Sequence, residues 1–176
     1  SKRENLLIVS GLGSPTYDVH AAGDSDKNFY LWGAMGGAAM MGLGLSLARP
    51  DNSVLVITGD GEQLMGLGAL ATIAVQKPKN LTIAVLDNEH FGETGMQKSH
   101  TGHAVNLTGV AKASGFPVAL DLTTMSDVIK CHKKLLSNEN LTFLNIKVSN
   151  QQFKRSLPLL DGVEIKNRFK RSLEIT

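Results

Sequence analysis

Apolar runs without polar alternation are the feature that most constrains how this chain can fold. The segments "NLLIVS" (5–10), "SVLVIT" (53–58) and "LTIAVLD" (81–87) each predict a strand that is covered on both faces. Because strands alternate with helices along the chain, parallel pairing through right-handed crossovers is the economical topology. The sequence therefore predicts an α/β three-layer sandwich around a mostly parallel six-stranded sheet. The helical patterns lie at 33–48, 61–76, 106–115 and 125–137.

The remaining segments complete this prediction. Further strands are expected at 28–32, 117–122 and 141–149. A chain of 176 residues is long enough for one domain with a sizeable core. We expect that domain over residues 1–150, followed by a C-terminal tail over 151–176 with a short helix near 161–173.

Composition excludes several classes of protein. A net charge of +2 is too small to indicate a nucleic-acid partner, and no apolar run reaches the length of a membrane span. A single cysteine, Cys131, excludes an internal disulfide and a cysteine-based metal site, and its helical position predicts a buried packing residue. This cysteine usage fits a reducing compartment, so we expect a cytoplasmic protein.

Two turns at predicted strand ends carry polar residues that a turn alone does not need. "GDG" (59–61) follows one strand, and "DNEHFG" (87–92) ends the next. If these strands are neighbours, Asp60 and Asn88 meet at one edge of the sheet, where their oxygens suit Mg²⁺ or Ca²⁺. The free amides after Gly61 would attract a phosphate. Asp-Gly and Asn-containing pairs are also common plain turns, so this interpretation rests on their paired spacing.

The two turns together resemble the thiamine-diphosphate (ThDP) motif of ThDP-dependent enzymes, in which "GDG" is followed some 26 residues later by an Asn-containing turn. Upstream, "WGAMGGAAMMGLGLSLA" (32–48) resembles a helix of the same family, with Met35 standing 25 residues before Asp60. Downstream, residues 86–116 resemble the sulfopyruvate and phosphonopyruvate decarboxylases. The resemblance covers roughly residues 5–150 and implies the diphosphate-binding domain of the ThDP-binding fold.

The resemblance implies a role for each matching residue around the metal and the diphosphate. Asp60 and Asn88 would bind Mg²⁺ through side-chain oxygens, with the backbone carbonyl of His90 as a third ligand. Gly61 and Glu62 would offer backbone amides to the diphosphate. The family usually has Ser or Ala where Glu62 stands, so an acidic side chain here is a departure. It is tolerable if that side chain turns away from the phosphates.

The same resemblance implies how the rest of the cofactor is held. Gly59 would begin the diphosphate motif, and Gly13 and Ser14 would approach the phosphates or the reacting carbon. The Gly33 carbonyl and the Met35 amide would bond the edge of the aminopyrimidine ring. The side chain of Met35, which is flexible and polarisable, would act as a wedge that keeps the cofactor bent. For Met35 alone, filling of the core is the competing interpretation.

The resemblance further implies an enzyme that depends on a second chain. The family activates thiamine with a Glu on a separate pyrimidine-binding domain, and this chain has room only for the diphosphate-binding one. It would be the β-type subunit of a hetero-oligomeric 2-oxo acid decarboxylase, a carbon–carbon lyase active only with a pyrimidine-binding α-type subunit. The substrate would be small and anionic, of the sulfopyruvate or phosphonopyruvate class. A carboligase, an oxo-acid oxidoreductase subunit and a non-catalytic Mg²⁺- or phosphate-binding module stay open as alternatives.

Other polar residues have two interpretations each. His100 and His103 follow the second turn, and histidine is the residue type suited to moving a proton near neutral pH, so they are candidates for proton transfer or for contact with an acidic substrate group. Plain loop histidines are the alternative. Glu93 and Thr94 could order a loop over the cofactor, or simply be polar loop residues. The basic run "KNRFKR" (166–171) predicts a solvated helix face, with docking on the partner subunit as the alternative.

Overall fold

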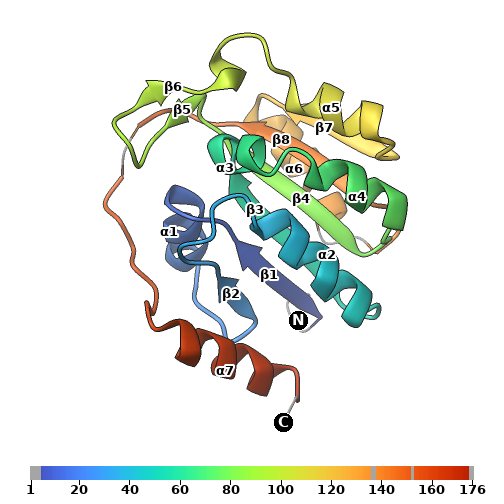
Figure 1. Cartoon of the computed structure of the whole chain (residues 1–176), viewed down its shortest axis with the longest axis vertical. Coiled ribbons are helices and arrows are strands. Elements are labelled where there is room, and N and C mark those ends of the chain that lie inside the picture. Colours follow the sequence, from blue (N-terminus) through green and yellow to red (C-terminus); the bar gives the residue numbers. More distant parts are fainter. Residues whose placement is uncertain (1–4, 136–137, 152, 175–176) are drawn as a thin grey trace.

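A parallel sheet runs through the middle of the computed structural model, which describes residues 5–135, 138–151 and 153–174 (Figure 1). Its six strands lie in the order β2-β1-β3-β4-β8-β7, and all neighbouring strands are parallel. The predicted α/β fold around a six-stranded sheet is therefore confirmed. The strands are β1 (Leu6–Ser10), β2 (Asn28–Tyr30), β3 (Ser53–Gly59), β4 (Leu81–Asp87), β7 (Val118–Leu122) and β8 (Thr142–Lys147).

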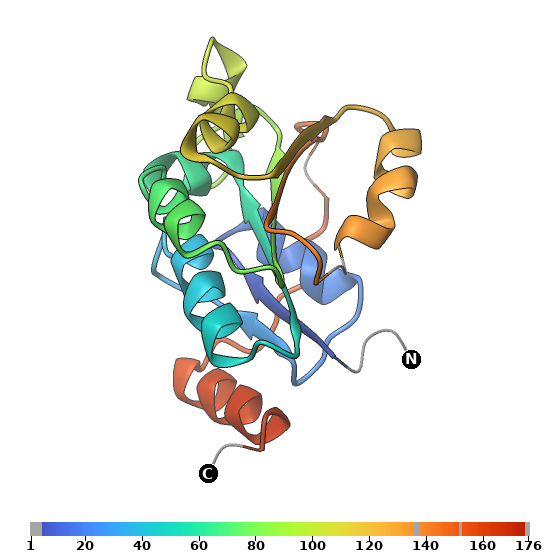
Figure 2. The same cartoon turned by 90° about the vertical axis from the view of Figure 1, so that its right-hand side faces the viewer.

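Helices cover both faces of the sheet, which gives the three layers (Figure 2). One face carries α2 (Ala38–Ala48), α4 (Ala69–Gln76) and α5 (Leu107–Ser114), and the other carries α1 (Ser14–Ala21) and α6 (Met125–Leu135). A short helix, α3 (Asp60–Met65), follows directly on the end of β3. Within the described ranges, no helix is long and apolar enough to cross a membrane.

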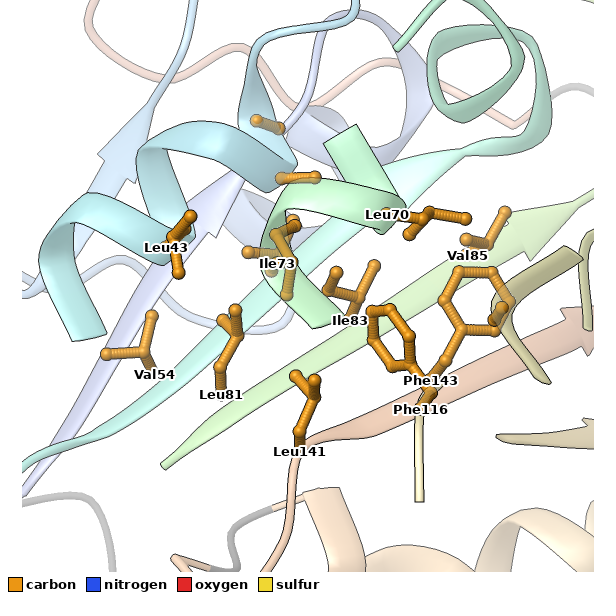
Figure 3. Packing of buried hydrophobic residues seen from close by; sticks show 14 of the residues in the cluster. Leu43, Val54, Leu70, Ile73, Leu81, Ile83, Val85, Phe116, Leu141 and Phe143 are labelled. Carbon is orange, nitrogen blue, oxygen red and sulfur yellow. The ribbon is translucent and has the colours of Figure 1, made fainter. Parts of the chain in front are cut away.

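The larger core lies between the sheet and the layer of α2, α4 and α5 (Figure 3). Successive residues of β3 point to opposite faces, so Val54 and Val56 enter this core while Leu55 enters a separate cluster. Each fully buried aliphatic side chain of this kind contributes about 1.5–3 kcal/mol to folding. On the other face, Cys131 of α6 is buried beside Leu144, which confirms it as a packing residue.

The predicted helix over 33–48 begins later than expected, at Ala38. Gly33 and Gly36 have φ angles of 71° and 89°, which a right-handed helix excludes. The segment "GAMG" (33–36) is therefore an irregular turn before α2, and Met35 lies on that turn rather than on a helix.

The single helix predicted over 61–76 is in fact two helices, α3 and α4, with a break at Gly66–Gly68. The helix is broken because the turn before α2 packs closely against Gly66. A Cβ atom at Gly66 would lie 2.3 Å from the carbonyl oxygen of Gly36. Helical periodicity does not reveal such a contact between distant segments.

Other boundaries differ by small amounts. The strands predicted at 28–32 and 141–149 are shorter than expected at their ends. The helix predicted at 125–137 is seen as α6 up to Leu135, and residues 136–137 lie outside the described residues. The helix predicted at 106–115 is confirmed as α5: the side chain of Asn106 caps its start and a left-handed glycine at position 115 follows its end.

A small excursion beyond β4 has no counterpart in the predicted elements. It consists of an antiparallel pair, β5 (His90–Phe91) with β6 (Gln97–Lys98), followed by a 3₁₀ turn, η1 (His100–Gly102). The Ser99 amide donates to the carbonyl of Glu89 at 2.8 Å. This bond brings the end of the excursion back to the tip of β4.

The C-terminal segment ends in α7 (Gly162–Ser172), which lies against the edge strand β2. Ile165 and Phe169 enter the cores on either side of that strand, so α7 covers a sheet edge that would otherwise be open. Arg168 of the basic run pairs with Asp24 at 2.8 Å, so this run is not a wholly solvated face. The division of the chain at residue 150 stays a prediction.

Candidate cofactor site

The ends of β3 and β4 lie side by side at one edge of the sheet. Gly59 pairs with Leu86, so Asp60 and Asp87 follow at the same level and Asn88 comes next. These two tips open into a cavity of about 390 Å³, at the edge where parallel sheets bind ligands. The predicted site residues that line it are Ser14, Met35, Gly59, Asp60, Gly61, Glu62, Asn88 and His90.

Asp60 is a buried carboxylate without a cationic partner. It is 2% exposed, and its Oδ2 accepts hydrogen bonds from the hydroxyls of Ser99 and Thr101, the latter at 3.1 Å. Burial raises the pKa of this carboxyl above its ordinary value, and the nearby charge of Asp87 raises it further. Among the described residues, Asp60 forms no ion pair. Its charge is therefore uncompensated at the floor of the cavity.

Asp87, by contrast, has a full set of partners. Its Oδ2 accepts from Lys147 Nζ at 2.7 Å and from Asn145 Nδ2 at 3.0 Å, and its Oδ1 accepts from the Thr101 hydroxyl at 2.7 Å. Burial would raise the pKa of Asp87, but the bonds from Lys147, Asn145 and Thr101 hold it below its usual range. The Thr101 hydroxyl therefore lies between the two carboxylates at the strand tips.

The residues that surround these acids escaped the sequence analysis. Ser99 and Thr101 lie about 40 positions after Asp60, and no local pattern marks them. Asp87 was visible as an acid at the end of a buried strand directly before Asn88, and this signal could have identified it. Lys147 ends β8, so only the strand order, in which β8 neighbours β4, brings it to the site.

A tight turn holds Asn88. Its Oδ1 accepts from the His90 amide at 2.9 Å, and the ring Nδ1–H of His90 donates to the carbonyl oxygen of Asn88 at 2.8 Å. Glu89 between them has a φ of 62°, which such a turn requires. The turn therefore fixes the Asn88 carboxamide at the wall of the cavity.

The Glu62 carboxylate is bonded into the protein rather than left free in the cavity. The residue is 4% exposed, and its carboxylate accepts from the Leu12 amide at 3.0 Å, the Thr58 hydroxyl at 2.8 Å and the Ala38 amide at 3.4 Å. Burial raises the pKa of Glu62, while these hydrogen bonds oppose that shift. An acid next to "GDG" is thus accommodated by binding to backbone amides.

Met35 meets Gly61 and Phe91 at the cavity. Met35 is 41% exposed, so it is not a core residue. A Cβ atom at Gly61 would lie 2.8 Å from Phe91 Cδ1 and 3.7 Å from Met35 Cε. Glycine is therefore required at position 61 for space, and an apolar surface of Met35 and Phe91 flanks it.

The turn before α1 forms another part of the site. Gly13 has a φ of 81°, and Ser14 lines the cavity. The side chain of Glu93, from the excursion after β4, lies against this turn, because a Cβ atom at Gly13 would come within 3.0 Å of Glu93 Cγ. Glu93 and Thr94 both line the cavity, which is where an ordering role would need them.

The segment that follows β8 forms the outer wall, defined here as residues 148–151 and 153–155. It passes between the β5–β6 pair and α1 on its way to α7 (Figure 1). Arg155 pairs with Glu93 at 3.4 Å, and its guanidinium lies 5.4 Å from the centre of the Tyr17 ring. These contacts hold the outer wall against the excursion and α1.

Some predicted site residues do not reach the cavity. Gly33 is exposed on the turn before Met35 and, like Gly13, is not among the lining residues. His100 and His103 are also exposed and do not line it, although the His100 ring packs edge-on to Phe91. Their roles stay predictions. The part of the chain that the structure describes contains no cluster of three or more His, Cys, Asp or Glu residues suited to a metal ion, so a cation here would also need amide or carbonyl oxygens.

Comparison with known proteins connects this geometry to a family. Residues 17–146 match the family described as thiamine pyrophosphate enzyme, C-terminal TPP binding domain. The chain is 36% identical to sulfopyruvate decarboxylase subunit beta of Methanocaldococcus jannaschii, over 97% of this chain and 90% of that protein. It is 35% identical to phosphonopyruvate decarboxylase of Streptomyces viridochromogenes, over 82% of this chain and 36% of that protein.

A solved structure shares the fold. It is the 2-oxoglutarate:ferredoxin oxidoreductase of Magnetococcus marinus, with a TM-score of 0.69 and 21% identity over 97% of this chain and 60% of that one. The family match covers most of the chain, and it includes both strand tips and the Met35 turn. The chain therefore belongs to the thiamine pyrophosphate enzymes, as a C-terminal TPP-binding domain similar to those of sulfopyruvate and phosphonopyruvate decarboxylases.

Proposed function

We propose that this chain binds ThDP and Mg²⁺ at the tips of β3 and β4, as the ThDP-binding subunit of a two-subunit decarboxylase for a small anionic 2-oxo acid. The observation that carries the proposal is the pairing of Gly59 with Leu86, because it brings Asp60 and Asn88 to one cavity. The names of the two decarboxylase relatives support a substrate of the sulfopyruvate or phosphonopyruvate class.

The residues at the two tips fit a magnesium ion. Asp60 would supply a carboxylate oxygen, Asn88 a carboxamide oxygen and His90 its backbone carbonyl. Mg²⁺ prefers such hard oxygen ligands and completes its shell with waters and substrate phosphates. Asp60 is buried and has no cationic partner among the described residues, so a bound cation would compensate a charge that is otherwise costly to bury.

The surrounding backbone would hold the organic part of the cofactor. Gly59, Gly61 and the Glu62 amide, which adjoin Asp60 in the chain, would contact the diphosphate, and so would Ser14, which lines the cavity, and Gly13 next to it. The turn containing Gly33 and Met35 would hold the pyrimidine end, with the exposed Met35 side chain as the wedge. Bound ThDP supplies the carbon nucleophile and the electron sink for decarboxylation, while the protein orients it and excludes water. His100 and His103 remain candidates for moving a proton.

A second chain would complete the enzyme. Activation of thiamine in this family needs a Glu on a pyrimidine-binding domain, which we assign to an α-type partner in a cytoplasmic hetero-oligomer. The chain spans 90% of a relative named as a beta subunit but only 36% of the phosphonopyruvate decarboxylase. The name of the first relative, subunit beta, supports a division of the enzyme between two polypeptides.

Calorimetry with ThDP tests the assignment. We expect the chain, with a candidate partner from the neighbouring gene, to bind ThDP only when Mg²⁺ is present. Asp60→Ala should weaken this binding at least about a hundredfold, or about 2.7 kcal/mol, because the carboxylate ligand is lost. Asp51→Ala, at an exposed turn, is the matched control and should bind like the wild type. Retained binding by Asp60→Ala would reject the metal assignment.

Turnover tests the need for a partner. The purified chain alone should release no CO₂ from sulfopyruvate or phosphonopyruvate, and addition of the partner should restore release from one of them. Turnover by the lone chain would refute the two-subunit proposal without affecting the cofactor assignment.

A further inference from the structure

The Glu62 carboxylate joins segments that are far apart in the sequence. Oε2 accepts from the Leu12 amide at 3.0 Å and from the Thr58 hydroxyl at 2.8 Å, and Oε1 accepts from the Ala38 amide at 3.4 Å. Gly36 contributes a further backbone hydrogen bond. The first residue of α2 and the turn after β1 are therefore bonded to one side chain on α3.

Gly11 provides the space that this arrangement needs. A Cβ atom at Gly11 would lie 1.6 Å from Glu62 Oε2 and 2.9 Å from Thr58 Oγ1. Gly11 is not among the glycines with positive φ, so any residue could adopt its backbone conformation. Glycine at this position is therefore explained by the carboxylate beside it, and Gly11 and Glu62 fit as a pair.

The bonded amides adjoin two turns that both contribute to the lining of the cavity. Leu12 directly precedes Gly13 and Ser14, and Gly36 directly follows Met35. Both Ser14 and Met35 line the cavity. A single carboxylate thus connects the two segments that carry Ser14 and Met35.

We propose that Glu62 is a positioning residue whose carboxylate fixes the Gly13–Ser14 turn and the Met35 turn relative to each other before the cofactor binds. This inference rests on the proposed function, which assigns these turns to the phosphate side and the pyrimidine side of ThDP. The acid that departs from the usual Ser or Ala beside "GDG" therefore contributes through its side chain as well as its backbone.

The chemistry of the contacts explains why a carboxylate is suited to this task. Its two oxygens accept from several donors at once, and hydrogen bonds to a charged acceptor are about twice as strong as neutral ones. Segments that are already ordered lose less freedom when a ligand binds, so preorganisation raises affinity. Glutamine has the same shape but presents an NH₂ group to one of the backbone amides, so at least one bond is lost.

The test compares Glu62→Gln with Glu164→Gln, an equal change of charge at a half-buried position on α7, where Glu164 pairs with Arg171 at 2.7 Å. Amide NMR of the metal-free chain should show changes at Leu12 and Ala38 only in Glu62→Gln. Calorimetry should then show about tenfold weaker binding of Mg²⁺–ThDP by this variant, with the control unchanged. Binding of Mg²⁺ with inorganic diphosphate should weaken less, because that ligand does not reach the Met35 turn.

The outcomes separate positioning from stability. If Glu62→Gln melts at a lower temperature but the folded protein binds Mg²⁺–ThDP with wild-type affinity, the role is structural and the proposal is wrong. A wild type that binds no ThDP, alone or with a partner, overturns the proposed function and with it the cofactor role of Glu62. That failure is recognised because the NMR changes at Leu12 and Ala38 would still occur.

A second pair of variants keeps the test valid if Glu62→Gln folds poorly. Gly11→Ala should destabilise the chain strongly, because its methyl group meets the carboxylate. Gly11→Ala combined with Glu62→Ser should recover part of that loss and still bind Mg²⁺–ThDP more weakly than the wild type. If Glu62→Ser gives no recovery, or the double variant binds like the wild type, the proposal is overturned.

Discussion

The aspartates at the two neighbouring strand tips are almost equally buried, at 2% and 1% exposure, yet their surroundings are opposite. Asp60 has neutral donors, the hydroxyls of Ser99 and Thr101 and a backbone amide, and no cation among the described residues. Asp87 receives the ammonium group of Lys147 as well as neutral donors. Burial raises the pKa of Asp60, whereas its partners hold the pKa of Asp87 below the ordinary value.

The difference shows that burial alone does not assign a role to an acid. The negative charge of Asp87 is compensated by Lys147, so Asp87 stabilises the fold and anchors the tip of β4. The negative charge of Asp60 has no cationic partner among the described residues, so the fold leaves this charge where the proposed cofactor metal would bind. The single hydroxyl of Thr101 is shared between the two carboxylates, at 2.7 Å from Asp87 and 3.1 Å from Asp60, and so it links the two tips.

Asp87→Asn is expected to have the largest effect on stability. Its new NH₂ group would face the donors Lys147 and Asn145, or lose Thr101, so buried hydrogen bonds would be broken. We expect a loss of about 2–3 kcal/mol, seen as a melting temperature lowered by about 5–10 °C. Asp51→Asn, in an exposed turn, is the control. If Asp87→Asn leaves the melting temperature unchanged, the hydrogen bonds of Asp87 do not stabilise the fold and the contrast drawn with Asp60 is wrong.

Asp60→Asn should act in the opposite direction when metal is absent. The amide keeps an oxygen acceptor for Ser99 or Thr101 and removes a buried charge that has no cation among the described residues. We expect the free energy of unfolding at pH 7 in a chelator to rise by about 1 kcal/mol, while metal-dependent binding is lost. Denaturant unfolding measures the change. A less stable Asp60→Asn would mean that its charge is balanced after all.

Asp24 is a third acid with a cationic partner, Arg168, and it is more exposed than Asp87. Burial would raise the pKa of Asp24, but hydrogen bonds from Arg168 at 2.8 Å and from Tyr30 at 2.7 Å lower it. A lowered folded-state pKa means stabilisation that is present above the unfolded value of about 3.9 and is lost as the pH falls through the folded value. The Asp24 side chain is 39% exposed, so we expect less than about 1 kcal/mol.

Melting curves of Asp24→Asn and the wild type at several pH values test this sign. The variant should be less stable at pH 7, and the difference should disappear in acid. A difference that grows as the pH falls would contradict the sign. The result for Asp24→Asn also shows how much a partly exposed ion pair contributes to the free energy of unfolding, compared with the buried carboxylate of Asp87.

The strands, and the meeting of Asp60 and Asn88 at the ends of two of them, could be predicted from the sequence. Continuous β-branched runs with acids or amides at their ends predicted β3 and β4, and parallel pairing then brought Asp60 and Asn88 together. These features follow from local pattern and from general rules of sheet topology.

The remainder depends on contacts between distant segments. The broken helix at Gly66 follows from the approach of Gly36, thirty positions earlier, and the partners of Asp60 come from a 3₁₀ turn about 40 positions later. Local periodicity contains no information about either approach. The orientation of the Glu62 side chain could not be predicted for the same reason, since its partners Leu12 and Ala38 lie in distant segments of the chain.

The route of the chain after β8 also affects how it can be shortened or tagged. A version cut at residue 150 would keep all six strands, but it would lose most of the outer wall of the cavity and the helix over β2. Phe29 and Tyr30 would then face solvent on a bare sheet edge, which invites aggregation. The last residues are therefore a poor place to trim, although they follow the final strand.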